Sequence, residues 1–191
     1  MNRLSKKLDE LKKQNKKVLV AYLVAGDPDL DSTLDIMHMF VKSGVDVIEV
    51  GVPFTDPIAE GPIIQRAHDR AITKKTSLED IFKLITKFRL KDDETPIVLM
   101  GYLNAFIFFR HLIEENKNNS VDSILVVDIP GELNIADYGI KNENINTISL
   151  ISPTTKADRI KSIANNSSGF IYYVTLRGVT GSSNLNVEEI S

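Results

Sequence analysis

The chain has 191 residues, of which 42% are hydrophobic and 26% are charged, an ordinary composition for a globular protein. Its formal net charge of -3 argues against a nucleic-acid-binding surface, and the absence of cysteine excludes disulfides, thiolate metal sites and cysteine nucleophiles. No apolar run reaches the ~18 residues of a membrane span, and the lysine-rich N-terminus is not a signal-peptide pattern. We therefore expect a cytoplasmic protein with one domain over residues 1–191.

Helical and strand patterns alternate along the chain. Leu4, Leu8 and Leu11 recur at helical spacing among lysines, which predicts a short amphipathic helix able to cap one end of a core. Apolar strands are then expected at 18–25, 45–50, 96–102, 121–128, 145–151 and 169–175. Helices are expected at 30–43, 63–73, 77–90, 104–116, 130–138 and 155–164, with Ser77 and Asp80 as a candidate cap pair for the third of them.

This repeated β-α order with short connections predicts an α/β fold with a parallel sheet and crossover helices. No Gly-x-Gly-x-x-Gly motif follows the first strand, so the dinucleotide-binding version of such a sheet is not supported.

The charged residue Glu49 interrupts the apolar run from Val47 to Val50 in the strand that begins at Val45. Alternation places it on the same face as Val45 and Val47, and both faces of a covered parallel strand are buried. A carboxylate there is either a paired structural acid or a catalytic group, because βα barrels carry their catalytic residues at this end of the strands. The acidic loop that follows, with Asp56 and Glu60, favours the catalytic interpretation.

Polar residues also follow other strands. Asp27 follows the first strand, Tyr102 and Asn104 follow the third, Asp128 ends the fourth, and Tyr172 lies within the sixth. If the strands line a barrel, these side chains converge on one rim. Each has a structural alternative as a turn residue, a helix cap or a core aromatic.

The remaining residue types narrow the chemistry. No strand or strand exit carries a lysine, which argues against Schiff-base catalysis. The three histidines lie on predicted helices without ligand spacing, where surface or packing roles are expected: His38, His68 and His111. An oxygen-only Mg²⁺ site formed by Asp27, Glu49 and Asp128 stays open, but metal-free acid–base chemistry by carboxylates is favoured.

Seven motifs together resemble the tryptophan synthase alpha subunit family, in the order in which that family carries them. They are Val-Ala-Gly-Asp-Pro at 24–28, Glu-Val-Gly-Val-Pro-Phe-Thr-Asp-Pro at 49–57, Gly-Pro-Ile-Ile-Gln-Arg-Ala at 61–67, Pro-Ile-Val-Leu-Met-Gly-Tyr at 96–102, Val-Asp-Ile-Pro at 127–130, Ser-Pro-Thr-Thr at 152–155 and Gly-Val-Thr-Gly at 178–181. The resemblance implies a TIM (β/α)₈-type barrel, with about six βα units present here. It also implies a lyase of tryptophan biosynthesis that cleaves indole-3-glycerol phosphate to indole and glyceraldehyde 3-phosphate without a cofactor or metal. A beta subunit that receives the indole, in an α₂β₂ complex, is the implied partner.

The resemblance further implies a role for individual positions. Glu49 matches the catalytic acid–base group, and Glu60 matches a second carboxylate that steadies positive charge on the indole N–H. Substrate-binding positions are implied at Tyr22, Tyr102, Asp128, Tyr172, Thr180 and Gly181. Asp56 and Asn104 match positions at the partner interface.

Three departures from the family pattern bear on these roles. Position 60 holds Glu where the family usually has Asp, and Thr175-Leu176-Arg177 stands where a Ser-Arg pair usually precedes Gly-Val-Thr-Gly. The sequence also shows six βα units, whereas the barrel has eight and places its phosphate site after strands 7 and 8. We therefore expect the 191 residues alone to associate or to stay partly molten.

These departures leave two alternatives open. One is a catalytically impaired alpha-like module that docks on the beta subunit and activates it. The weaker one is a Mg²⁺-dependent barrel enzyme that acts on another phosphorylated substrate.

Overall fold

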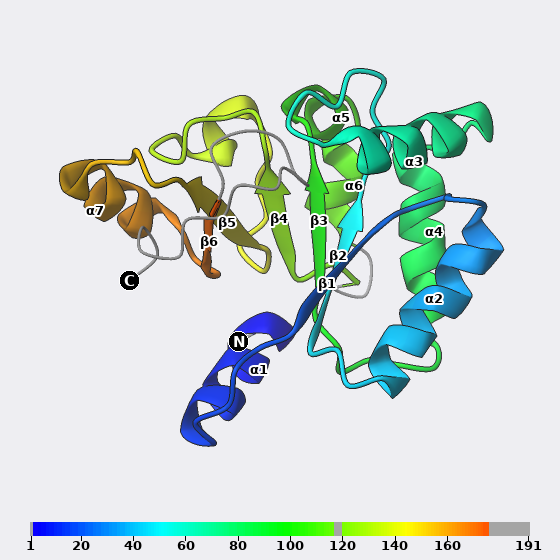
Figure 1. The fold of residues 1–191 in the computed structure, drawn as a ribbon, viewed down its shortest axis with the longest axis horizontal. Helices are drawn as coiled ribbons and strands as arrows, with labels where there is room; N and C mark the ends of the chain where they lie inside the picture. The colour runs from blue at the N-terminus through cyan, green and yellow to red at the C-terminus, as the bar shows by residue number, and fades with distance from the viewer. Residues whose placement is uncertain (1, 117–119, 176–191) are drawn as a thin grey trace.

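Six parallel strands form one sheet in the computed structural model, which describes residues 2–116 and 120–175 (Figure 1). The strands are β1 (Val20–Val24), β2 (Val47–Gly51), β3 (Ile97–Gly101), β4 (Ser123–Val126), β5 (Asn146–Ile151) and β6 (Ile171–Tyr173). Their order in the sheet is their order in the chain, with no reversal. That order is the winding of a TIM-type barrel and not of a doubly wound sheet, so the predicted fold class is confirmed.

Helix α1 (Arg3–Lys13) precedes the first strand, and the other helices connect the strands on the outer side of the sheet (Figure 1). These connecting helices are α2 (Leu30–Lys42), α3 (Pro62–Thr73), α4 (Leu78–Arg89), α5 (Leu103–Phe108), α6 (Arg110–Glu115), the 3₁₀ helix η2 (Ile135–Tyr138) and α7 (Ala157–Asn166). Helix α4 begins with the predicted pairing of Ser77 and Asp80, which forms a capping box. Among the described residues, no helix is both long enough and apolar enough to cross a bilayer.

Two predicted helices differ from the structure. The segment 104–116 forms two short helices that meet at Phe109, and this break lets Phe106 and Ile113 both enter the core while Phe108 stays exposed. The segment 130–138 forms only the 3₁₀ turn η2, which Gly139 ends in the left-handed conformation at φ 81°. Both segments lack a single apolar stripe, so periodicity could not fix their extent.

Alternation of side chains along the strands creates a core on each face of the sheet. The face toward the helices is built from Ile48, Val50, Ile97, Leu99 and Ile124, together with apolar residues of α4. The opposite face carries Val47, Val98, Leu125 and Ile148, which pack around Leu4 of α1. Helix α1 thus covers the N-terminal ends of the strands, as predicted, and each fully buried Leu or Val contributes about 1.5–3 kcal/mol (Figure 1).

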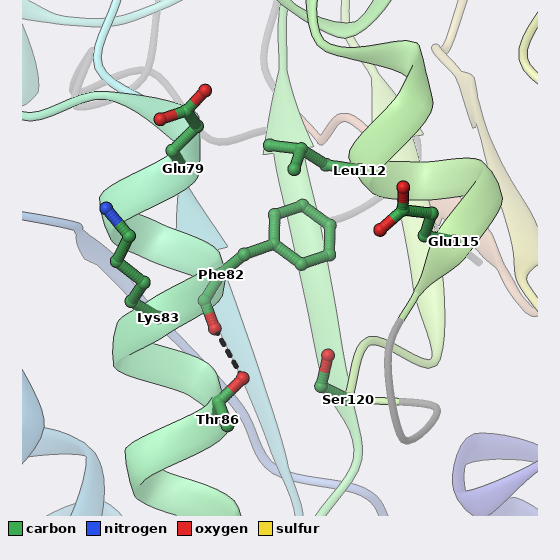
Figure 2. Close-up of a pocket in the computed structure, with 7 residues that line it drawn as sticks. All are labelled: Glu79, Phe82, Lys83, Thr86, Leu112, Glu115 and Ser120. Atoms are coloured by element: carbon green, nitrogen blue, oxygen red, sulfur yellow. Dashed lines mark hydrogen bonds between the residues drawn. The ribbon is translucent and has the colours of Figure 1, made fainter.

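The outer layer leaves a groove of about 360 Å³ between α4 and α6 (Figure 2). Phe82 and Leu112 form its apolar floor, and the Thr86 hydroxyl donates to the Phe82 carbonyl at 2.8 Å. This groove lies on the helical layer, on the opposite face of the sheet from Glu49.

Candidate active site

Glu49 lies in the middle of β2, on the face opposite the helices, and only 4% of it is exposed. Its Oε1 is buried and accepts no hydrogen bond from the described part of the chain. Burial raises the pKa of Glu49 to about 7, and the nearby Glu60 carboxylate adds to the increase. A carboxyl with this pKa can both give and take a proton at neutral pH.

Glu60 ends the loop that follows β2, and it too is only 4% exposed. The loop turns back toward the sheet: the Glu60 N–H donates to the Pro57 carbonyl at 3.0 Å, and the Gln65 side chain donates to the Glu60 carbonyl at 2.8 Å. The charge of Glu60 contributes to the raised pKa of Glu49, of Tyr22, of Tyr102 and of Tyr172. The longer side chain at position 60 therefore lies among the other site residues.

Tyr102 anchors this loop from the end of β3. Its Oη accepts the Ala59 N–H at 3.0 Å, and its ring stacks on Phe54 with centroids 4.5 Å apart. Burial is the main cause of its raised pKa. The side chain is 3% exposed, so in this structure Tyr102 contributes to the site by holding the loop that carries Glu60.

Two further tyrosines share the environment of the carboxylates. Tyr22 of β1 is the register partner of Glu49 in β2, and its ring lies over Gly51. Tyr172 of β6 is 38% exposed, and its pKa is raised by burial first and then by the charges of Glu49 and Glu60. Residues from the two outermost strands of the described sheet therefore converge on Glu49.

The other strand-exit carboxylates are engaged elsewhere. Asp128 Oδ1 accepts the Leu103 N–H at 2.8 Å and so caps the start of α5. Asp27 binds Arg70 of α3 with both oxygens, at 2.7 and 2.8 Å. Within residues 2–116 and 120–175, no cluster of three potential ligands could hold a metal ion, so Asp27, Glu49 and Asp128 do not form the Mg²⁺ site that was left open.

Of the remaining predicted positions, Asp56 and Asn104 are exposed. Asp56 lies in the β2–α3 loop and Asn104 in α5, on the side where the strands end (Figure 1). Thr180 and Gly181 lie outside the described residues.

His68 is a site residue that the sequence did not reveal. Of the expected surface and packing roles, its 2% exposure fits packing, and in addition its Nδ1 accepts the Phe54 N–H at 3.0 Å. Its Nε2 lies 3.5 Å from Tyr22 Oη. The one available signal was its place on the face of α3 that also carries Ala67 and Ala71, directly after a family motif.

A parallel sheet wound in chain order, with carboxylates and tyrosines gathered at the carboxyl ends of its strands, defines an enzyme of the TIM-barrel class. The family model described as tryptophan synthase alpha chain matches residues 8–191. The chain belongs to the tryptophan synthase alpha chain family, a family of lyases in tryptophan biosynthesis.

Individual relatives agree with this membership. The tryptophan synthase alpha chain of Thiobacillus denitrificans is 44% identical over 195 residues, which cover 100% of this chain and 71% of that protein. The crystal structure of the alpha subunit from Legionella pneumophila str. Paris is 40% identical, with a TM-score of 0.85, covering 91% of this chain and 68% of that one. A structure of the a2b2 complex from Pyrococcus furiosus is 38% identical, with a TM-score of 0.74, covering 82% of this chain and 65% of that one.

Proposed function

We propose that this protein cleaves indole-3-glycerol phosphate to indole and glyceraldehyde 3-phosphate, with Glu49 as the acid–base group. The observation that carries the proposal is the burial of Glu49 in the middle of β2, with one oxygen that has no hydrogen-bond partner among the described residues and a pKa raised to about 7. Burying a carboxyl without a partner is costly, and such groups are concentrated at catalytic sites.

The reaction is a retro-aldol cleavage, and a carboxyl suits both of its proton transfers. Glu49 gives a proton to indole C3, and the bond between C3 and the glycerol carbon then breaks with its electron pair returning to the indole ring. The hydroxyl on that glycerol carbon loses its proton to the Glu49 carboxylate and becomes the aldehyde. Proton gain and loss balance, so the step needs no oxidant, reductant or cofactor.

Glu60 is the second carboxylate of the proposal. Protonation at C3 places positive charge on the indole N–H, and a carboxylate that accepts that N–H stabilises the charge as it develops. The burial of Glu60 and its electrostatic contact with Glu49 support this role. They also favour an active enzyme over an impaired docking module, because two buried neighbouring carboxylates repel each other and serve no purpose in mere docking.

Substrate binding is proposed for six residues. Their support is unequal: Tyr22 and Tyr172 share the environment of the carboxylates, Tyr102 holds the loop, and Asp128 fixes the start of α5. The roles of Thr180 and Gly181 rest on the family motif alone.

We also infer a docking surface for a beta subunit beside the site. Asp56 and Asn104 are exposed there, and two large apolar side chains on the same loop and helix are exposed as well, Ile58 at 68% and Phe108 at 76%. Exposed apolar side chains that cluster with polar ones are typical of protein interfaces. The assembled Pyrococcus furiosus relative supports a partner of this kind.

Replacing Glu49 with Gln tests the function. We expect indole release, measured without beta subunit, to fall by roughly 10²–10⁴-fold, because Gln keeps the shape of the side chain but cannot transfer the proton. The exposed Glu143→Gln is the matched control and should retain full activity. A loss of less than tenfold with unchanged substrate affinity would remove Glu49 from the mechanism. An inactive parent that still stimulates a beta subunit would favour the docking module instead.

A further inference from the structure

His68 uses both ring nitrogens inside the protein. Its Nδ1 accepts the Phe54 N–H at 3.0 Å, at the start of the loop that leads to Glu60. Its Nε2 faces the Tyr22 hydroxyl at 3.5 Å, the long end of hydrogen-bond range. The ring therefore links α3, the β2–α3 loop and β1.

These two contacts determine the protonation state of the imidazole. A backbone N–H can only donate, so Nδ1 must carry its lone pair and no proton. The neutral ring then carries its proton on Nε2, which points at Tyr22. Burial lowers the pKa of His68 despite the opposing charge of Asp69, which agrees with a neutral ring.

The Tyr22 hydroxyl accepts the Nε2 proton, so its own proton must point elsewhere. The ring is held over Gly51: a Cβ at that position would lie 2.3 Å from Tyr22 Oη, so only glycine leaves room for it. Gly51 and Glu49 lie two residues apart on the same face of β2, about 7 Å along the strand. Tyr22 is also the register partner of Glu49, so the two side chains lie on the same face of the sheet and the Tyr22 proton can turn toward the carboxylates.

We propose that His68 is a positioning residue that holds the Tyr22 hydroxyl with its proton directed at the Glu49–Glu60 carboxylates. The proposal rests on the proposed lyase function and extends it to a hydrogen-bonded chain from Phe54 through His68 and Tyr22 to the site. The raised pKa of Tyr22, caused first by burial and then by the charges of Glu60 and Glu49, agrees with a protonated hydroxyl beside the carboxylates. A donor at this place stabilises the carboxylate form of the acid–base group during turnover.

The first test measures the protonation state of the His68 imidazole by NMR and does not depend on enzyme activity. In the ¹⁵N-histidine-labelled full chain, the His68 signals are identified as those lost in His68→Gln. We expect a neutral ring with its proton on Nε2 at pH 7, and a change in the Nε2 signal in Tyr22→Phe. An Nδ1-protonated ring, an imidazolium, or no response to Tyr22→Phe overturns the proposal even in an active lyase. An inactive chain with the expected signals would instead overturn the proposed function alone.

The second test separates the two ring nitrogens by substitution. In His68→Asn the amide oxygen can replace Nδ1 and keep Phe54 in place, but the side chain is too short to reach Tyr22. In His68→Gln the longer side chain can still reach it. We expect kcat to fall roughly 3- to 10-fold in His68→Asn with KM changed less than about twofold, and His68→Gln to recover most of the loss.

A double-mutant cycle with Tyr22→Phe completes the test. Tyr22→Phe should lower kcat by a similar factor. The double variant Tyr22→Phe/His68→Asn should have a kcat no lower than that of the less active single variant, because both changes remove the same hydrogen bond. His111→Asn, at an exposed position of α6, is the control. If the two kcat losses multiply in the double variant, or if His68→Asn keeps the kcat of the parent, His68 only packs in the core and does not position Tyr22.

Discussion

At the scale of single residues, the site is built from carboxylates whose burial lowers the stability of the folded chain. Glu49 is buried with one oxygen that no described residue binds, and Glu60 adds a second carboxylate beside it. Neither would persist in a core selected for stability alone, because a charged carboxylate loses its hydration there. The burial that makes Glu49 a useful acid–base group must therefore weaken the fold at pH values where the group is charged.

This cost can be measured as a dependence of stability on pH. The pKa of Glu49 is about 7 in the folded chain, against an ordinary value of 4.5. Because the folded pKa is raised, its stabilising contribution is fully present below pH ~4.5 and is lost as pH rises through ~7. We expect Glu49→Gln, which cannot ionise, to match the parent near pH 4.5 and to exceed it by about 3 kcal/mol at pH 8.5.

Urea unfolding of both proteins across this pH range checks the prediction, since titrating groups that do not interact with Glu49 cancel in the difference. Glu143→Gln, at an exposed position, should show no such trend relative to the parent. A constant difference between Glu49→Gln and the parent would mean that Glu49 is not buried in its charged form.

The sequence predicted the position and role of some site residues and not of others. Glu49 was found because a charge inside an apolar strand is visible in one dimension, and alternation assigns its face. His68 was missed because its partners, Phe54 and Tyr22, come from other elements, and helical periodicity does not say what a buried face meets. Asp128 lies at the predicted strand end, but its contact with the Leu103 N–H depends on how β4 sits beside β3.

At the scale of elements, the opposite end of the sheet is held by one buried ion cluster. Asp122, 1% exposed, accepts hydrogen bonds from the Ile97 N–H at 2.9 Å, from Arg89 at 2.9 Å and from Arg3 at 3.3 Å. It thereby joins β3, α4 and α1 just before β4. Burial raises the pKa of Asp122 and lowers the pKa of Arg89 to about 10, so both groups are desolvated and each depends on the other.

Asp122→Asn should therefore destabilise the chain by about 3 kcal/mol, because it leaves the Arg89 charge buried without its counter-ion. The urea midpoint should fall accordingly, while residual indole release per folded molecule stays unchanged, since the cluster lies at the end of the barrel that serves stability. Asp35→Asn, an exposed change on α2, is the control. An equally small effect of both variants would show that the cluster is not required for folding.

Elements with a single strong pattern were predicted well and mixed ones were not. The strands and α4 were found because runs of β-branched residues and a capping box are local signals. The break at Phe109 was not, because 105–109 is apolar on every side and only the core decides which aromatic is buried.

At the scale of the whole molecule, strand order and the site follow from the same cause. Parallel strands in chain order bring all their carboxyl ends to one edge of the sheet, so the polar residues predicted to follow the strands had to lie together at that edge. The alternation of strands and helices was enough to predict this arrangement. Periodicity does not encode side-chain contacts. It therefore could not tell which polar residues at the strand ends take part in catalysis and which cap helices.

The same edge carries the proposed partner surface, and this yields the last prediction. Phe108 is 76% exposed on α5, the helix that starts directly after Tyr102, and an aromatic that is a hot spot of an interface contributes about 2 kcal/mol or more. We expect Phe108→Asp to weaken binding to a tryptophan synthase beta subunit by at least about tenfold in titration calorimetry. Basal indole release by the unpartnered protein should change less than about twofold, because Phe108 is exposed whereas the carboxylates are buried.

Leu90→Asp is the matched control, since Leu90 is also an exposed apolar residue, 83% exposed, at the far end of α4. Helix α4 runs antiparallel to the strands, so its C-terminal end lies at the edge of the sheet where the strands begin (Figure 1). If the partner covers the edge that carries the site, only the Phe108 variant loses affinity. Equal losses in both variants, or none in either, would place the partner elsewhere on the molecule and separate the lyase site from the docking surface.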